Sequence, residues 1–244
     1  SIFEKNKFIS AVIGVGGFSQ EILIPNLIKL EKINSINTLC LRRPVSVLNA
    51  RKNYKDINIT NNYDQILENK NINVIFITTR HNLHFPMIMK ALKAGKNVFC
   101  EKPLCITKKE LSSIKNFFLK TSKQVIVTGF NRRFSSATEI MKKFIEDQND
   151  PVFLNYTVNA DQLDKRSWVY TKEGGGRNIG EACHFYDLIL YLIGEKYVEV
   201  NANAMFDKKK SKSNKTDNFF VQIKFSNGSI AQINYSTAGA KPSY

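Results

Sequence analysis

The sequence predicts an α/β protein: an N-terminal Rossmann domain on a doubly wound parallel sheet, then a C-terminal α+β domain with an open, mostly antiparallel sheet. Two observations predict it. Short apolar runs alternate with amphipathic stretches as far as about Phe130, which is typical of strands joined by right-handed helical crossovers. Beyond that point strand patterns follow one another, and Asn227-Gly228 marks a hairpin. We therefore expect domains over residues 1–130 and 131–244.

The elements of the first domain follow from hydrophobic periodicity and turn residues. Uncharged runs rich in β-branched and apolar residues predict buried strands over 8–15, 37–41, 73–78, 97–100 and 124–129. Amphipathic spacing predicts helices over 21–30, 45–53, 85–94 and 107–119. Thr107 and Glu110 form a capping box at the start of the last of these helices.

The second domain is expected to contain two helices and four strands. The helices are predicted over 136–146 and 180–193, and the strands over 152–159, 198–205, 218–225 and 229–235. A glycine-rich turn at Gly174-Gly175-Gly176 precedes the second helix. Because the chain stops at Tyr244 without a finishing element, we expect this domain to be incomplete and the chain to be a fragment of a longer protein.

Composition narrows the class of protein. The chain is 43% hydrophobic, and it contains neither a bilayer-length apolar run nor a signal-peptide pattern at its N-terminus. Its four scattered cysteines match neither a zinc spacing nor a disulfide framework, so we expect a cytoplasmic protein without a metal site. The net charge of +15 also permits nucleic-acid binding, but the dense cluster Lys208–Lys212 is interpreted as a solvated loop. We expect no nucleic-acid or membrane partner.

The first strand ends in a turn of nucleotide-binding type, formed by Gly14, Gly16, Gly17, Phe18 and Ser19. Glycines there allow a tight turn and bring the backbone close to a pyrophosphate, which then lies at the N-terminus of the following helix. Ser19 stands at the third glycine position, where a small residue still allows the helix to pack on the strand. The alternative is an ordinary glycine turn.

The end of the second strand indicates which nucleotide binds. A NAD site usually offers an acidic residue to the ribose hydroxyls, whereas this strand ends in Leu41-Arg42-Arg43 with no carboxylate nearby. Arginines at this place hold the 2′-phosphate of NADP, so NADP is favoured over NAD. Two solvated arginines in a loop remain the alternative.

Chemistry-bearing residues follow the strands over 73–78 and 97–100. Thr79, Arg80, His81 and His84 come after the first of them, at the edge of the sheet where ligands bind, and we assign them to the cofactor. Glu101-Lys102-Pro103 follows the second strand. A lysine there hydrogen-bonds a substrate hydroxyl and the nicotinamide ribose, which stabilises alkoxide-like charge during hydride transfer. The alternative is a surface charge before a turn.

His184 is the acid/base candidate of the second domain. Glu181 and Asp187 flank it at i−3 and i+3, so all three side chains could share part of one helical face. A histidine between two carboxylates after a glycine-rich turn suits proton transfer, although a lone helical histidine is more often structural.

With these residues in place, the chain resembles the Gfo/Idh/MocA family of glucose–fructose, inositol and related oxidoreductases. The resemblance rests on the glycine turn and on motifs at residues 79–84, 91–98, 101–103, 129–134 and 174–187. It implies a Rossmann domain that binds NAD(P), a C-terminal open sheet through which dimers or tetramers often form, and redox chemistry on sugar-type alcohols. The family's lysine maps on Lys102 and its helix histidine maps on His184.

One departure weakens the implied proton relay. Many members carry an aspartate four residues before the histidine, where this chain has Gly180, and Glu181 is the expected substitute. Residues 176–187 also resemble a subgroup fused to a zinc alcohol-dehydrogenase-like domain in surface-polysaccharide loci. We predict catalysis by Lys102, His184 and Glu181. Substrate contacts are assigned to Arg133, Trp168 and Asp187. The alternative is a regulatory NAD(P)-binding protein that has lost the relay.

Overall fold

The structure is a computed structural model that describes residues 7–121, 123–148, 150–205 and 217–239. The chain divides into two compact units, residues 1–129 and 130–244. The lysine cluster at 208–212 and the chain end at Tyr244 lie outside the described residues.

The first unit is built on a six-stranded sheet in which every neighbouring pair is parallel, in the order β3-β2-β1-β4-β5-β6. This is the strand order of a dinucleotide-binding Rossmann domain, so the predicted fold class is confirmed. The strands are β1 (Phe8–Ile13), β2 (Asn34–Cys40), β3 (Asn58–Thr60), β4 (Val74–Ile77), β5 (Asn97–Cys100) and β6 (Ile126–Thr128).

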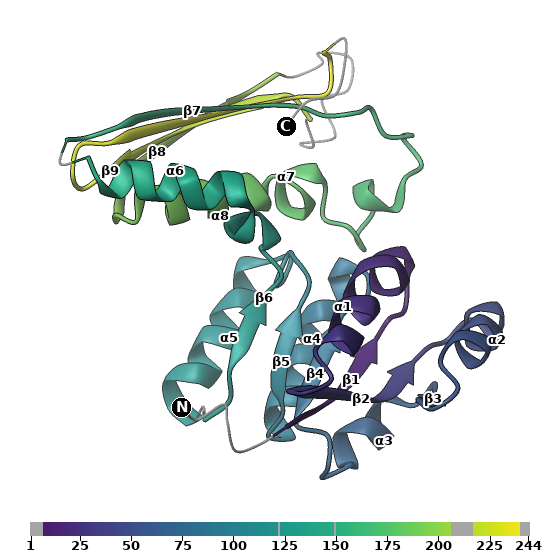
Figure 1. Ribbon diagram of the computed structural model, residues 1–244. Coiled ribbons are helices and arrows are strands. Elements are labelled where there is room, and N and C mark those ends of the chain that lie inside the picture. The colour runs from purple at the N-terminus through teal and green to yellow at the C-terminus, as the bar shows by residue number, and fades with distance from the viewer. Residues whose placement is uncertain (1–6, 122, 149, 206–216, 240–244) are drawn as a thin grey trace. The chain divides into compact units, whose positions relative to one another are not determined.

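Helices cover this sheet in two groups, as doubly wound topology requires (Figure 1). Alternate residues of β1 separate the two cores: Val12 packs with α1 and α2, whereas Ala11 and Ile13 pack with α3, α4 and α5. The helical elements are the π-helical turn η2 (Ser19–Leu23), α1 (Ile24–Lys29), α2 (Pro44–Asn53), α3 (Tyr63–Glu68), α4 (His81–Lys93) and α5 (Lys108–Thr121).

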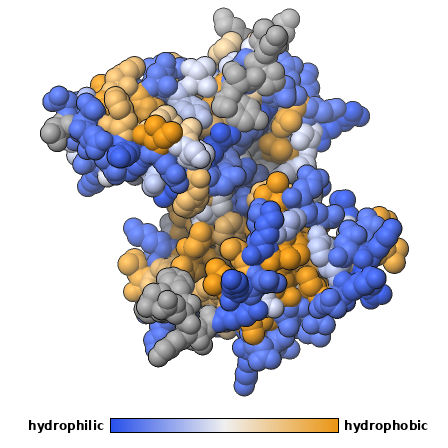
Figure 2. Space-filling model, viewed as in Figure 1, coloured by the Kyte–Doolittle hydropathy of each residue, from blue (hydrophilic) through white to orange (hydrophobic). Residues whose placement is uncertain are grey.

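On the sheet face that carries α1 and α2, the helices leave β4, β5 and β6 more exposed than β1 and β2. Phe76 and Phe99 are paired in register there, with ring centroids 5.3 Å apart, and Val127 extends the same row. Val127 is 49% exposed. Figure 2 shows apolar side chains at the surface of this unit among the hydrophilic ones.

Two parts of the first unit differ from the prediction. The first helix begins at Ser19 with a π-helical turn, closed by the bond from Ile24 N–H to Ser19 O; Pro25, which has no N–H, follows at the start of α1. The helix predicted from residue 85 begins at His81, which places both histidines of this region in its first turn and a half. The prediction also omitted β3 and α3, both of which are short.

The second unit is a four-stranded mixed sheet in the order β7-β10-β9-β8, parallel only between β7 and β10. Helices α6 and α8 lie along one face, where Phe185 and Ile189 pack on Ile233 and Tyr235 (Figure 1). The strands are β7 (Phe153–Asn159), β8 (Tyr197–Ala204), β9 (Phe219–Phe225) and β10 (Ile230–Ser236). The helical elements are η3 (Asn131–Phe134), α6 (Ser136–Glu146), η4 (Trp168–Tyr170), α7 (Arg177–Gly180) and α8 (Cys183–Ile193).

The helix predicted over 180–193 is divided in two. Helix α7 ends at Gly180, and Glu181 leaves the helical conformation with φ −126° before α8 begins at Cys183. Gly175 and Gly176, with φ of +78° and +90°, form the turn that admits the chain to α7.

The sheet face opposite α6 and α8 is polar. One row across all four strands consists of amide side chains, joined by register in the order Asn155, Gln232, Gln222 and Asn201. The next row contributes Asn234, which donates to Asn155 Oδ1 at 2.8 Å. This face is therefore hydrogen-bonding and open, whereas the other face holds the core of the unit.

The turn after β1 requires glycine at one position and leaves room at another. At Gly14 φ is +88°, and a Cβ there would lie 2.7 Å from Thr79 Cγ2 and 3.0 Å from Thr78 O. At Gly16 a Cβ would meet nothing within 4 Å. A side chain at Gly14 would therefore meet both an unfavourable backbone conformation and a steric clash, whereas a side chain at Gly16 would not clash.

We expect Gly14→Ala to lower the free energy of unfolding by about 1–3 kcal/mol, because the substitution adds left-handed strain and a clash with Thr79. Gly16→Ala is the matched control and should leave that free energy within about 0.5 kcal/mol of wild type or raise it slightly. Urea denaturation followed by circular dichroism measures both. Equal losses in the two variants would contradict the assignment.

Candidate functional site

The predicted cofactor residues of the first unit all follow carboxyl ends of its parallel strands. Gly14 follows β1, Arg42 follows β2, Thr79 follows β4 and Lys102 follows β5. Parallel pairing brings these ends to one edge of the sheet. The direction of winding reverses between the neighbours β1 and β4, which is where open α/β sheets bind ligands.

The glycine turn is held from inside the protein. Ser19, 1% exposed, has its Oγ 3.0 Å from Gly14 O and 2.7 Å from Thr78 Oγ1, so its single O–H donates to one of these two atoms. Thr78 Oγ1 in turn donates to Gly14 O at 2.5 Å. Ser19 therefore stabilises the turn from behind, and this placement argues against the direct cofactor contact predicted for it.

The outer side of the same turn fits a dinucleotide. Gly16, Gly17 and Phe18 are exposed, and the space beside Gly16 is open, so a pyrophosphate can approach the backbone closely. The two arginines after β2 are also exposed, with Arg43 at the N-cap of α2. Burial raises the pKa of the Cys40 thiol at the strand end, and the nearby Arg42 charge partly offsets that rise.

Lys102 lies beside a half-buried carboxylate. Its backbone N–H donates to Glu101 Oε2 at 3.3 Å, and burial raises the pKa of the Glu101 carboxyl while Lys102 lowers it. The carboxylate fits over Gly129, where a Cβ would lie 2.5 Å from Glu101 Oε1. Glu101 N–H also donates to Ile77 O at 2.9 Å, which fixes the backbone just before the lysine. The Lys102–Pro103 peptide bond is cis.

The other predicted cofactor residues of this edge have different surroundings. Thr79 packs against Gly14, Arg80 is exposed at the N-cap of α4, and His81 is half-buried with its ring centroid 5.8 Å from that of His84. His84 is 0% exposed, and its ring nitrogens lie 2.7 Å from Pro103 O and 3.0 Å from Thr79 O. This enclosure argues against direct contact between His84 and a cofactor.

In the second unit the segment after β6 packs on the first turns of α8. The Phe130 ring stands edge-on to the ring of His184, with centroids 6.1 Å apart. Arg133 binds Asp187 through two hydrogen bonds, of which Nε to Oδ2 is 2.6 Å long, and its guanidinium lies 5.2 Å from the ring centroid of Tyr191. The predicted substrate residues Arg133 and Asp187 therefore form an ion pair with each other beside the helix turn that carries His184.

Glu181 is bound by an arginine that the sequence analysis did not single out. Arg177 is 4% exposed and reaches Glu181 Oε2 with Nη2 at 2.8 Å and Nε at 3.0 Å. Arg177 also donates to Asp161 O and lies 5.6 Å from the ring centroid of Tyr235. The i, i+4 spacing of Arg177 and Glu181 was the signal that could have predicted this pair.

Trp168 lies in η4, close to the glycine-rich turn. A Cβ at Gly174 would come within 2.7 Å of Trp168 O and 2.4 Å of Val169 Cα, so only glycine allows this approach of the two backbones. The turn therefore fixes η4 and α7 relative to each other within the unit.

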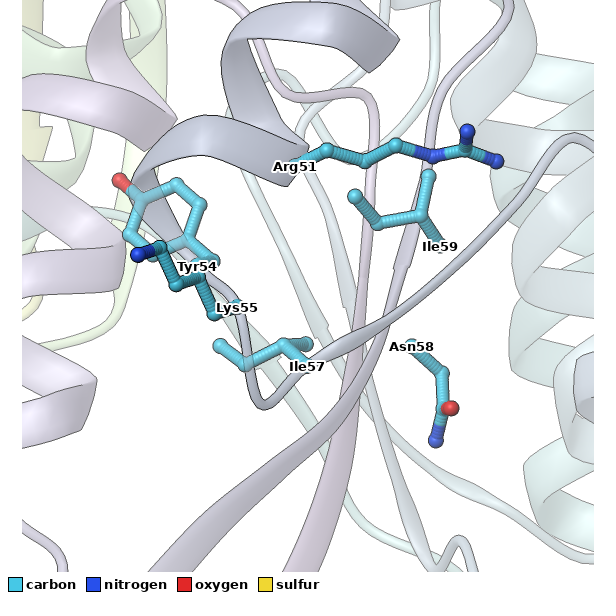
Figure 3. A pocket seen from close by; sticks show the side chains of 6 residues that line it. All are labelled: Arg51, Tyr54, Lys55, Ile57, Asn58 and Ile59. Carbon is cyan, nitrogen blue, oxygen red and sulfur yellow. The ribbon is translucent and has the colours of Figure 1, made fainter.

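A hollow of about 380 Å³ lies beside the outer strand β3 of the first unit. Figure 3 shows Arg51 at the end of α2 and the residues that follow it, Tyr54, Lys55, Ile57, Asn58 and Ile59. Strand β2 separates β3 from the strand that carries the glycine turn, so we do not assign the cofactor to this hollow.

The described residues contain neither a membrane-spanning helix nor a metal-binding cluster. Within ranges 7–121, 123–148, 150–205 and 217–239, no helix has the length and apolar character needed to span a bilayer. In the same ranges no group of three or more histidine, cysteine, aspartate or glutamate side chains is placed to hold a metal ion.

Comparison with known families identifies the chain. Residues 8–129 match the model of the oxidoreductase family with an NAD-binding Rossmann fold, and residues 150–243 match the Gfo/Idh/MocA C-terminal domain. The chain belongs to the Gfo/Idh/MocA family of oxidoreductases. The resemblance of the sequence motifs is thereby confirmed for both halves.

Individual relatives agree with the family assignment. Myo-inositol 2-dehydrogenase of Thermotoga maritima is 27% identical over 213 residues, which is 85% of this chain and 60% of that protein. Levoglucosan dehydrogenase of Pseudarthrobacter phenanthrenivorans is 30% identical over 167 residues, 65% of this chain and 42% of that protein. A solved levoglucosan dehydrogenase in complex with NADH and levoglucosan has the same fold, with a TM-score of 0.85, 24% identity, and coverage of 98% of this chain and 69% of that one. The chain thus spans less than two thirds of the two curated relatives.

We expect Asp187→Asn to lower the free energy of unfolding by about 1–2 kcal/mol. The substitution leaves the partly buried Arg133 guanidinium without its carboxylate partner. Because the Arg133 side chain is 38% exposed, the loss of stability is smaller than for a fully buried pair. Asp164→Asn breaks the exposed pair with Arg166 and serves as control, with little expected change. Urea unfolding followed by Trp168 fluorescence reports on this unit. A loss as small as that of the control would contradict a stabilising role of the pair.

Proposed function

We propose that the chain functions as an NAD(P)-dependent oxidoreductase that acts on a sugar, an inositol or a nucleotide sugar. The observation that carries the proposal is the position of Lys102. It follows β5 at the same sheet edge where the glycine turn follows β1, next to the switch point between β1 and β4.

The residues divide the chemistry between them. A bound nicotinamide would supply the hydride donor or acceptor at its C4 position. In the oxidative direction the Lys102 ammonium donates a hydrogen bond to the substrate oxygen and stabilises its growing negative charge. The imidazole of His184 takes the hydroxyl proton, so the alcohol loses one hydride and one proton and becomes a carbonyl.

The substrate class is inferred from relatives that carry the names of inositol and levoglucosan dehydrogenases. Trp168 remains our candidate for direct substrate contact. Arg133 and Asp187 are bound to each other, and we assign them to support of the helix that carries His184. The surface-polysaccharide role and the fusion to a zinc alcohol-dehydrogenase-like domain stay predictions of the sequence motif, with no support from the relatives.

Two exposed arginines support NADP over NAD. Arg42 and Arg43 follow β2 without an acidic neighbour in that segment, which suits a 2′-phosphate better than a free ribose.

For assembly we propose a dimer or tetramer through the polar face of the C-terminal sheet, whose amide row offers paired donors and acceptors. A cytoplasmic location and the lack of a nucleic-acid partner stay predictions from composition.

A second candidate function is a regulatory NAD(P)-binding protein without turnover. It is favoured by Gly180, which replaces the family's aspartate, and by the capture of the Glu181 carboxylate by Arg177. Such a protein would bind NADPH but reduce no NADP with any sugar alcohol.

The deciding experiment is fluorescence titration with NADH and NADPH, followed by a screen of inositols, sugars and nucleotide sugars for reduction of the oxidised cofactor. We expect tighter binding of NADPH and turnover of at least one substrate class. Binding without any turnover would favour the regulatory function, and absence of binding would contradict both.

With a substrate in hand, we expect Lys102→Ala to lower kcat about 10²–10³-fold through loss of the donor to the reacting oxygen. His184→Ala should lower kcat about 10²–10⁴-fold. Lys93→Ala removes an exposed lysine of α4 and serves as control. Steady-state kinetics measures all three, and unchanged turnover in the first two variants would contradict the assigned roles.

A further inference from the structure

His84 joins two loops of the sheet edge from inside the protein. Its ring is fully buried in α4, with Nδ1 2.7 Å from Pro103 O and Nε2 3.0 Å from Thr79 O. The first carbonyl belongs to the residue after Lys102, and the second to the loop after β4. One side chain thus connects the loop that carries the lysine with the loop that packs on the glycine turn.

The connection continues to β1. A Cβ at Gly14 would lie 2.7 Å from Thr79 Cγ2, so Thr79 rests directly on the glycine. Contacts therefore run from Gly14 through Thr79 and His84 to Pro103. The first of these residues borders the open cradle for a pyrophosphate, and the last follows the lysine.

The two partners of His84 restrict where its proton lies. Carbonyl oxygens only accept hydrogen bonds, and a neutral imidazole has one N–H to donate. Burial lowers the pKa of His84, the two carbonyl partners raise it, and the Lys102 charge lowers it. A neutral ring must choose one partner, and Nδ1 makes the shorter contact of the two.

We propose that His84 is a positioning residue for Lys102, whose Nδ1–H holds the Pro103 carbonyl and thereby fixes the backbone on the C-terminal side of the lysine. On the other side the bond from Glu101 N–H to Ile77 O already fixes the chain. Lys102 is then anchored on both sides. The inference rests on the proposed function, since it gives Lys102 the task of meeting the substrate oxygen.

Two amide substitutions separate the two ring nitrogens. The amide nitrogen of asparagine lies about where Nδ1 lies, and that of glutamine about where Nε2 lies, so each variant keeps one donor. We expect His84→Asn to keep kcat within about threefold of wild type. His84→Gln should lower kcat about 10–100-fold with nearly unchanged KM and cofactor affinity, because only the lysine is displaced.

The effect must pass through the lysine. In a Lys102→Ala background, the difference between the asparagine and glutamine variants should disappear. A difference that persists there, or equal kcat in the two single variants, would overturn the proposal. Urea unfolding of both variants checks that each is folded before the comparison.

A second measurement needs no substrate. Because the chain has three histidines, the ring nitrogens of ¹⁵N-labelled protein can be assigned with His81→Asn and His184→Asn. We expect a protonated Nδ1 at His84 at neutral pH, and hydrogen exchange over residues 101–106 that rises in His84→Gln but not in His84→Asn. An unprotonated Nδ1 or equal exchange would overturn the proposal. A protein that is inactive on every substrate but still shows the protonated Nδ1 and the difference in exchange would contradict the proposed function and support the hydrogen bond from His84 to Pro103 O.

Discussion

The parallel pairing of β1 with β4 is the constraint on which the first unit depends. The strands are separated in sequence by β2 and β3, yet their register runs from Ser10 opposite Val74 to Ile13 opposite Ile77. This register puts Gly14 directly beside Thr78 and Thr79, so the Gly14 carbonyl oxygen lies within hydrogen-bond distance of the hydroxyls of both Ser19 and Thr78. The separate pairing of β4 with β5 then brings Lys102 to the same edge. A slip of one residue would turn every buried side chain of β1 to the opposite face.

Elements with a clear apolar pattern were predictable, either from a continuous apolar run, as in β4 and β5, or from amphipathic spacing, as in α6. The runs at β4 and β5 and the helix over 136–146 were predicted within one or two residues of the observed bounds. The short polar elements were not. Strand β3 has three residues, Asn58–Thr60, and α3 depends on the Asn62 side chain, which accepts hydrogen bonds from Asp64 N and Gln65 N at 3.0 and 3.2 Å. Such short elements are stabilised by contacts with neighbouring strands and side chains, and hydrophobic periodicity in the sequence does not reveal these contacts.

For the candidate site, sequence order predicted which residues reach the edge but not which way their side chains turn. Motif spacing placed Gly14, Thr79 and Lys102 correctly after their strands. It gave no sign that Ser19 and His84 are enclosed, because the Thr78 hydroxyl beside Ser19 and the Pro103 carbonyl beside His84 come from other segments of the chain. In the same way, Asp187 was predicted to bind substrate because it follows His184 by three residues. Its partner Arg133 is 54 residues earlier in the chain, and no local pattern joins the two.

The two acids that flank His184 in sequence are both paired with arginines. Each flanking acid has its own arginine, Arg177 for Glu181 and Arg133 for Asp187. A carboxylate already balanced by a guanidinium has less attraction left for a protonated imidazole, because hydrogen bonds and charge are shared with the nearer partner. The same pairs hold the backbone on both sides of His184, one from α7 and one from the segment before α6. Where many family members carry an aspartate, this chain has Gly180, and an ion pair lies on each side of His184 instead. Under the proposed function, the two acids would therefore support the segment that carries His184 rather than accept its proton.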